Sequence, residues 1–187
     1  MKDMGLCSGR RSVVALLAVA LAGAACDDPT RAPMASPELL QLGADNVMYG
    51  MTSYLTLSGV REGRIEADTA YLFADSSTAH LRSMRVVFYD DRGEERASVT
   101  GLAGEWDQSS DKMIARGNVV LLVRSDGRKI ESPEIHYDPQ SERIWSDSAT
   151  VQTLADGTVT RGTAFQSDLE FENLRIENPR GGGIVVF

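Results

Sequence analysis

Short runs in which apolar and polar side chains alternate fill most of residues 45–178, and they constrain the fold more than any other feature. Alternation with a period of two is typical of β-strands that bury one face. The clearest inward-facing sets are Met84, Val86 and Phe88 in one run and Val119, Leu121 and Val123 in another. Since this region shows no sustained helical periodicity, the sequence predicts an all-β domain.

Turn signals separate these runs at regular intervals. A polar residue followed by glycine, as tight hairpins prefer, occurs at Arg92-Gly93, Asp126-Gly127 and Asp156-Gly157. An aromatic residue followed by aspartate recurs at Trp106-Asp107 and Tyr137-Asp138, so the pattern repeats about every 30 residues. One repeat of this length cannot bury its apolar face alone. We therefore expect repeated antiparallel strand pairs that stack into one continuous core.

Residues 1–25 have the features of a secretory signal peptide. Basic residues precede an apolar run from Val13 to Ala22, and small residues follow it up to Cys26. The apolar run is shorter than the roughly 20 residues that a membrane-spanning helix needs. A cysteine directly after small residues resembles the lipobox of bacterial lipoproteins, whose cysteine is acylated and becomes the first residue. The alternative is an ordinary signal peptide followed by a chance cysteine.

The chain divides into four parts on this interpretation. After the signal peptide, residues 26–43 contain three prolines and are expected to form an extended linker between the lipid and the domain. The β domain is expected over residues 44–180, and residues 181–187 form a glycine-rich tail. The second cysteine, Cys7, leaves with the signal peptide, so the mature chain has no internal disulfide.

Composition excludes some partners. The 187 residues include 27 acidic and 19 basic side chains, a net charge of −8, and the signal peptide removes mainly basic ones. Such a chain should not bind nucleic acid or anionic bilayers by charge. The hydrophobic content of 42% is sufficient for a packed core in a domain of ordinary size.

Residues that could carry out a reaction are sparse. The two histidines, His80 and His136, lie in no metal-ligand spacing, and the sequence contains no Gly-x-Ser-x-Gly motif. The single cysteine of the mature chain lies at the tether, where no pocket can form around it. We therefore expect a protein that is not an enzyme and that needs no cofactor or metal.

Several segments resemble the OstA/LptA/LptC superfamily. Ala115–Leu121, which reads Ala-Arg-Gly-Asn-Val-Val-Leu, Ile130–Asp138 and Ile144–Ser146 are similar to motifs that recur in this order in that family. Gly157–Asp168 is similar to the C-terminal pattern of the LptC branch. The resemblance covers roughly residues 45–178, nearly the whole expected domain.

This resemblance implies a fold and a function. The fold is a twisted open β-jellyroll, a folded sheet with a hydrophobic groove between two walls. The function is to accept lipopolysaccharide from the inner-membrane ABC transporter and to pass it to a periplasmic bridge protein similar to LptA. In the better-known members, an N-terminal transmembrane helix anchors LptC. Here a lipid on Cys26 is expected to place the domain at the periplasmic face of the inner membrane. Asp27 resembles the inner-membrane retention signal of enteric lipoproteins, and the outer membrane stays open as an alternative.

Lipid carriage needs apolar side chains that remove acyl chains from water. The expected groove residues are Met84, Val86, Phe88, Met113, Val119, Leu121, Val123, Ile130, Ile135, Ile144, Val151, Val159 and Phe165. The alternative is that all of them fill a sealed sandwich core. A local basic patch could face lipid phosphates or could simply be solvated, and it consists of Arg61, Arg64, Arg82 and Arg85.

The two ends of a strand stack are unpaired edges that can bind other chains. The family pairs such edges head to tail, one sheet continuing into the next. On that interpretation the strand near Asp45–Leu57 meets the transporter, and the strand Leu169–Ile176 meets the bridge protein. The alternative is that the proline- and glycine-rich ends only cap the stack.

Two other functions compete with lipid transport. A β-repeat lipoprotein could act as an envelope assembly scaffold without lipid cargo. A sugar-binding sandwich would need a row of exposed aromatic side chains, and the chain has only two tryptophans and five tyrosines.

Overall fold

The computed structural model describes residues 43–184 except residues 58 and 75. The expected signal peptide, Cys26 and nearly all of the expected linker lie outside these residues. The described residues form twelve β-strands and no helix, and so they contain no helix that could span a membrane. The predicted all-β class is confirmed.

The strands follow one another along the chain with short connections. They are β1 (Asn46–Leu57), β2 (Val60–Leu72), β3 (Thr78–Tyr89), β4 (Glu95–Asp107), β5 (Lys112–Val123), β6 (Lys129–Asp138), β7 (Arg143–Ser146), β8 (Thr150–Thr153), β9 (Thr158–Gly162), β10 (Ala164–Asp168), β11 (Arg175–Glu177) and β12 (Arg180–Ile184).

All strand pairs are antiparallel, and β1 to β7 pair in chain order. The predicted turns Arg92-Gly93, Asp126-Gly127 and Asp156-Gly157 connect β3 to β4, β5 to β6 and β8 to β9. The glycine of each turn has a positive φ, between 68° and 85°, which glycine adopts without steric cost. The repeating unit is therefore a strand pair with its turn, as the sequence indicated.

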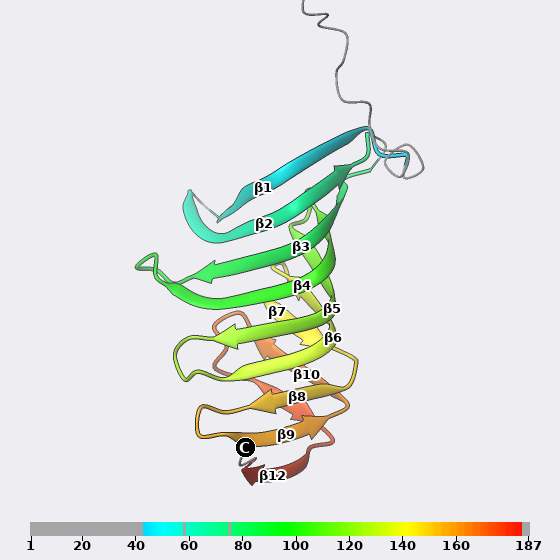
Figure 1. Ribbon diagram of the computed structural model, residues 1–187. Helices are drawn as coiled ribbons and strands as arrows, with labels where there is room; N and C mark the ends of the chain where they lie inside the picture. Colours follow the sequence, from blue (N-terminus) through cyan, green and yellow to red (C-terminus); the bar gives the residue numbers. More distant parts are fainter. Residues whose placement is uncertain (1–42, 58, 75, 185–187) are drawn as a thin grey trace, which may run out of the picture. The chain divides into compact units, whose positions relative to one another are not determined.

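The short strands at the C-terminal end are halves of longer strands that break in the middle. β6 pairs with β8 through residues 129–131 and with β7 through residues 136–138. From there β7, β10 and β11 continue one wall of the sheet, called wall A, while β8, β9 and β12 continue the other, called wall B. Figure 1 shows these walls as two layers. The sheet is therefore folded along one line and open at its edges, which is the predicted open β-jellyroll.

The fold line follows residues with a left-handed backbone. Ser83 in β3 and Gly117 and Asn118 in β5 have φ values of 51°, 77° and 49°, and the regular pairing is interrupted beside each of them. At each interruption the inward-facing positions shift by one residue along the strand. Leu81 and Met84 are both buried although they are three residues apart, so the inner face of wall A continues into the inner face of wall B.

The C-terminal end differs from the expectation. Residues 169–173 form a turn instead of a strand, and only Arg175–Glu177 pair, as β11. Residues 181–184, expected in a tail, belong to β12, which pairs with β9. Glycine lacks a side chain but keeps its backbone donor and acceptor, so a glycine-rich segment can still complete a ladder beside an ordered strand.

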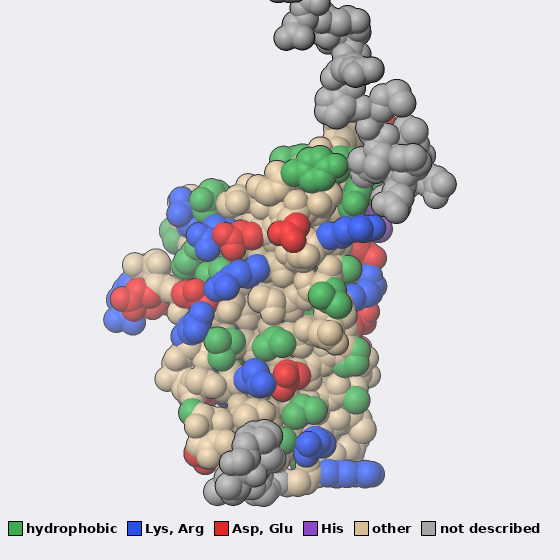
Figure 2. Space-filling view, viewed as in Figure 1, with side chains coloured by type: hydrophobic (Ala, Val, Ile, Leu, Met, Phe, Trp, Pro, Cys, Tyr) green, Lys and Arg blue, Asp and Glu red, His purple; other side chains and the backbone are tan. Residues whose placement is uncertain are grey.

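The core lies between the walls. One cluster of buried apolar side chains extends from Met51 and Leu55 in β1 to Phe165 in β10 and Phe171 in the following turn. Charged side chains of both signs are interspersed over the outer face in Figure 2. Such a surface is typical of a sheet with one dry and one solvated face.

Candidate functional site

The inner face of the folded sheet brings most of the predicted groove residues together. All but two of them belong to the single buried cluster between the walls. These are Met84, Val86, Phe88, Met113, Val119, Leu121, Val123, Ile130, Ile135, Ile144 and Phe165, each at most 4% exposed.

The two exceptions lie on the short strands of wall B. Val151 pairs with Glu131, while Gln152 pairs with the inward-facing Ile130, so Val151 is on the outer face and is only half-buried. Val159 is buried at 9% exposure but lies outside the central cluster. The expectation that Val151 points inward is wrong, because the alternation set by the buried Ile144, Ser146 and Thr150 continues through residues 147–149 and places odd-numbered Val151 on the other face.

The interior is closed in this conformation. A void of only about 10 Å³ remains, and residues of both walls line it, among them Met84, Phe88, Met113 and Ile144. A void of that size is at the limit for one water molecule and is too small for a hydrocarbon chain. The inner residues therefore pack against one another, and lipid could enter only if the walls moved apart.

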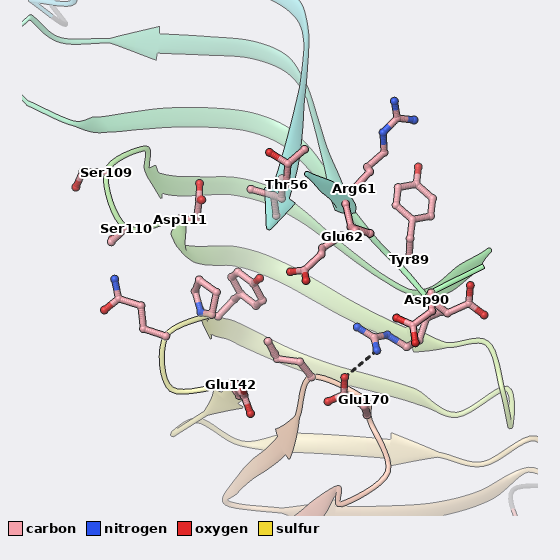
Figure 3. Close-up of a pocket in the computed structure, with 18 residues that line it drawn as sticks. Thr56, Arg61, Glu62, Tyr89, Asp90, Ser109, Ser110, Asp111, Glu142 and Glu170 are labelled. Atoms are coloured by element: carbon pink, nitrogen blue, oxygen red, sulfur yellow. Dashed lines mark hydrogen bonds and ion pairs between the residues drawn. The ribbon is translucent and has the colours of Figure 1, made fainter. Parts of the chain in front are cut away.

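A cleft of about 640 Å³ lies at the mouth between the two walls. Figure 3 shows Thr56, Glu62 and Asp90 on the wall B side and Asp111 and Glu142 on the turns of wall A. The side chains at its rim are mostly polar, whereas the void behind it has only Tyr137 as a lining residue with a polar group. The cleft is therefore polar, like the surroundings of a lipid headgroup, and the interior is apolar, like the surroundings of acyl chains.

Tyr137 connects the cleft to the interior, because it lines both. Its ring lies 5.2 Å from the ring of Phe88, measured between centroids. Burial raises the pKa of the Tyr137 phenol far above its ordinary value. The side chain is thus a neutral, mostly apolar group at the entrance to the core.

The turn at residues 169–174 extends from wall A to wall B at the C-terminal end of the mouth. Phe171 is 2% exposed, and its ring centroid lies 5.9 Å from that of Phe88. The Glu170 carboxylate forms an ion pair with Nη1 of Arg96 at 3.1 Å. Nη2 of Arg128 donates a hydrogen bond to the Phe171 carbonyl at 3.3 Å. Sequence reasoning assigned this segment to a strand and so missed Phe171.

The predicted basic patch is engaged within the protein. Arg61 stacks over the Tyr54 ring at 4.1 Å, and Arg82 lies 5.5 Å from the Tyr71 ring. Arg64 and Arg85 both form ion pairs with Glu66, at 3.2 and 4.0 Å. Each of these arginines therefore has a partner within the protein, and only Arg64 and Arg85 share one.

The histidines lie on wall A. His136 contacts Glu134 and stacks on Trp145, with ring centroids 5.1 Å apart and planes at 15°. His80 packs edge-on against Phe73. Within the part of the chain that the structure describes, no three potential metal ligands gather.

The folded sheet ends in edge strands at both ends of the stack. Within the described residues β1 pairs only with β2, so its other edge is open, as predicted for Asp45–Leu57. Exposed apolar side chains gather there, including Met48, Tyr49 and Tyr54. The opposite end has two terminal strands, β11 in wall A and β12 in wall B.

Comparison with known proteins agrees with the motifs. Residues 13–179 match a family described as lipopolysaccharide-assembly, LptC-related. The structure is similar to that of LptH from Pseudomonas aeruginosa, described as the LptA-homologous periplasmic component of the lipopolysaccharide transport device. That likeness has a TM-score of 0.48 and 16% identity, and it covers 61% of this chain and 80% of the other. Among curated proteins, none matches this sequence. Because the family match spans most of the chain, the protein belongs to the LptC-related family of lipopolysaccharide-assembly proteins.

Proposed function

We propose that this protein accepts lipopolysaccharide from the inner-membrane ABC transporter and passes it to a periplasmic bridge protein. The observation that carries the proposal is the arrangement of the folded sheet, whose inner faces are almost wholly apolar behind a polar mouth. A chain of about ten methylenes gains roughly 8 kcal/mol when it leaves water for an apolar environment. That gain is large enough to compensate for separating part of the packed interior.

The partners are assigned from the edges of the sheet. The open edge of β1 would pair with the periplasmic part of the transporter, and its exposed Met48, Tyr49 and Tyr54 would add apolar contact. The bridge protein would pair with a terminal strand at the C-terminal end, β11 or β12, and not with a strand over residues 169–176. The domain would be held at the periplasmic face of the inner membrane by a lipid on Cys26.

Site-specific photo-crosslinking in cells tests the lipid assignment. A photoreactive residue at the inward positions Phe88 and Leu121 should capture lipopolysaccharide. The same residue at the outward positions Arg85 and Arg124 is the control. Capture only at the outward positions would refute the assignment of the interior as the lipid site.

The closed interior favours one alternative, an envelope assembly scaffold without lipid cargo. A sheet whose inner face is sealed needs no ligand to be stable, and the void of about 10 Å³ agrees with that role. Depletion of the protein separates the two functions. Loss of a carrier should stop delivery of lipopolysaccharide to the cell surface, whereas loss of a scaffold should leave delivery intact.

A further inference from the structure

The turn at residues 169–174 fastens one wall to the other at the mouth. It leaves β10 in wall A, and Glu170 and Phe171 contact wall B through Arg96 of β4 and Arg128 before β6. Its Phe171 side chain reaches the buried cluster, where it meets Phe88. The wall A turn before it, at residues 139–142, lines the open cleft.

The backbone of the turn is held in an uncommon conformation. Phe171 has a φ of +61°, a left-handed value that bulky residues rarely adopt. The Asp168 carboxylate accepts hydrogen bonds from the amides of Glu172 at 3.0 Å and Asn173 at 3.4 Å, and so it stabilises the turn. Strain of this kind persists only where surrounding contacts impose it, and it is frequent at clamps and switches.

Open space lies on both sides of the turn. The mouth cleft borders it on one side, and a second cleft of about 660 Å³ separates it from the turns of wall B on the other. Arg96 and Glu170 line both clefts. If the ion pair between them broke and the turn lifted, the two clefts would join above the position that Phe171 leaves.

We propose that the space filled by Phe171 is an acyl-chain subsite and that the Phe171 ring is its built-in occupant. A hydrocarbon chain of the glycolipid displaces the ring, the turn lifts, and the chain continues along Phe88 into the interior. The same movement frees Arg96 from Glu170, so its guanidinium group faces the anionic headgroup at the mouth. Arg128 loses the Phe171 carbonyl and keeps its ion pair with Asp126. This inference rests on the proposed function and adds the step that opens the site.

Displacement makes a quantitative prediction. A site that is open only part of the time binds with an affinity reduced by the open fraction. Glu170→Gln weakens the ion pair to Arg96, and Phe171→Ala removes the occupant, so both variants should bind more tightly. Glu172→Gln is the matched control, since this acid lies in the same turn and its carboxylate is in no ion pair among the described residues.

The test measures equilibrium binding of fluorescently labelled lipopolysaccharide to the full-length chain, with hydrogen exchange of the same samples. We expect Glu170→Gln and Phe171→Ala to lower the apparent Kd by at least about threefold, and Glu172→Gln to leave it unchanged. In the natural chain, added lipopolysaccharide should speed exchange of the Glu172 and Asn173 amides, because the turn that protects them lifts.

Other results would overturn the inference in distinguishable ways. If the natural chain binds lipopolysaccharide but both variants match it and the amides stay protected, the displacement is wrong while the proposed function stands. If neither the natural chain nor any variant binds, the proposed function and the subsite fail together. Since Glu170 is 60% exposed, its variant keeps the test valid even if Phe171→Ala does not fold.

Discussion

Replacing Leu121 with alanine tests whether the interior is a packed core in the empty protein. Leu121 is fully buried in wall B, where it pairs with Val99 of β4 on one side and Ile130 of β6 on the other. Its neighbour Leu122 lies on the outer face of the same strand and is half-buried. Leu122→Ala therefore makes the same chemical change on the opposite face and serves as the control.

The loss of unfolding free energy depends on how far the surrounding structure can move into the space that the Leu121 side chain leaves. Truncation of a buried leucine costs the lost transfer free energy and a further amount for the cavity that remains, together about 2–5 kcal/mol. Strands on both sides fix the backbone around Leu121, and the interior holds a void of only about 10 Å³. We therefore expect the upper part of that range, about 3–5 kcal/mol. For Leu122→Ala we expect about 1 kcal/mol or less.

Urea unfolding, followed by circular dichroism, measures both values. With a slope of about 1–3 kcal/mol per molar, Leu121→Ala should lower the urea midpoint by roughly 1–5 M at an unchanged slope. Added lipopolysaccharide should recover part of the loss, because a ligand that binds the folded state stabilises it. Equal costs for the two substitutions, or a cost below about 1 kcal/mol for Leu121→Ala, would show that the inner face is not a packed core.

Three further predictions concern other parts of the molecule. A hydrogen bond from Arg116 lowers the pKa of the Glu134 carboxyl below its ordinary value of 4.5. The ionised Glu134 therefore stabilises the fold at neutral pH, and this stabilisation is lost as pH falls below about 4.5. In Arg116→Gln the unfolding free energy should decrease less on acidification than in the natural chain, by under about 1 kcal/mol, as measured by unfolding at several pH values. A Cβ added at Gly104 would overlap Sδ of Met84, so Gly104→Ala should cost about 1–3 kcal/mol, and a double-mutant cycle with Met84→Ala should show that the costs do not add. Cys26→Ala should move the protein from the membrane fraction to the soluble fraction, and continued membrane association would contradict the lipid tether.

The repeat and the turns were predictable because they depend on local properties. A period of two specifies strands, and a polar residue before glycine specifies a hairpin turn. The family motif Ala-x-Gly-Asn-Val now has a physical explanation as well. Its Gly117 and Asn118 supply the left-handed backbone at the fold line, and glycine and asparagine are the residues that adopt this conformation most readily.

The fold line itself could not be predicted from alternation. In β3 the left-handed residue is Ser83, which carries no sequence signal for that conformation. The only trace of the bend is that the inward residues Leu81 and Met84 are three apart instead of two. The wrong face predicted for Val151 has another cause. The buried positions beside it, Ser146 and Thr150, are polar, so apolar patterning selects Val151 as the inward residue.

Phe171 was missed for a different reason. It is a single apolar residue between Glu170 and Glu172, and the strand predicted for residues 169–176 gave it no place in the core. Its burial depends on Phe88, Arg96 and Arg128, which lie more than forty positions away in the sequence. Long-range contacts of this kind are not encoded in any periodicity.

A closed interior is compatible with a lipid carrier and follows from the properties of an empty one. An apolar inner face of two β walls, if left open, would expose a patch larger than soluble proteins usually tolerate. Packing the walls together removes that patch, and it also means that an entering acyl chain replaces one set of apolar contacts with another. The net affinity is then the difference between two similar quantities and stays moderate, so that the lipid can leave again. On the proposed function, the seal around Leu121 and the Phe171 ring would therefore set how tightly cargo is held between its arrival and its release.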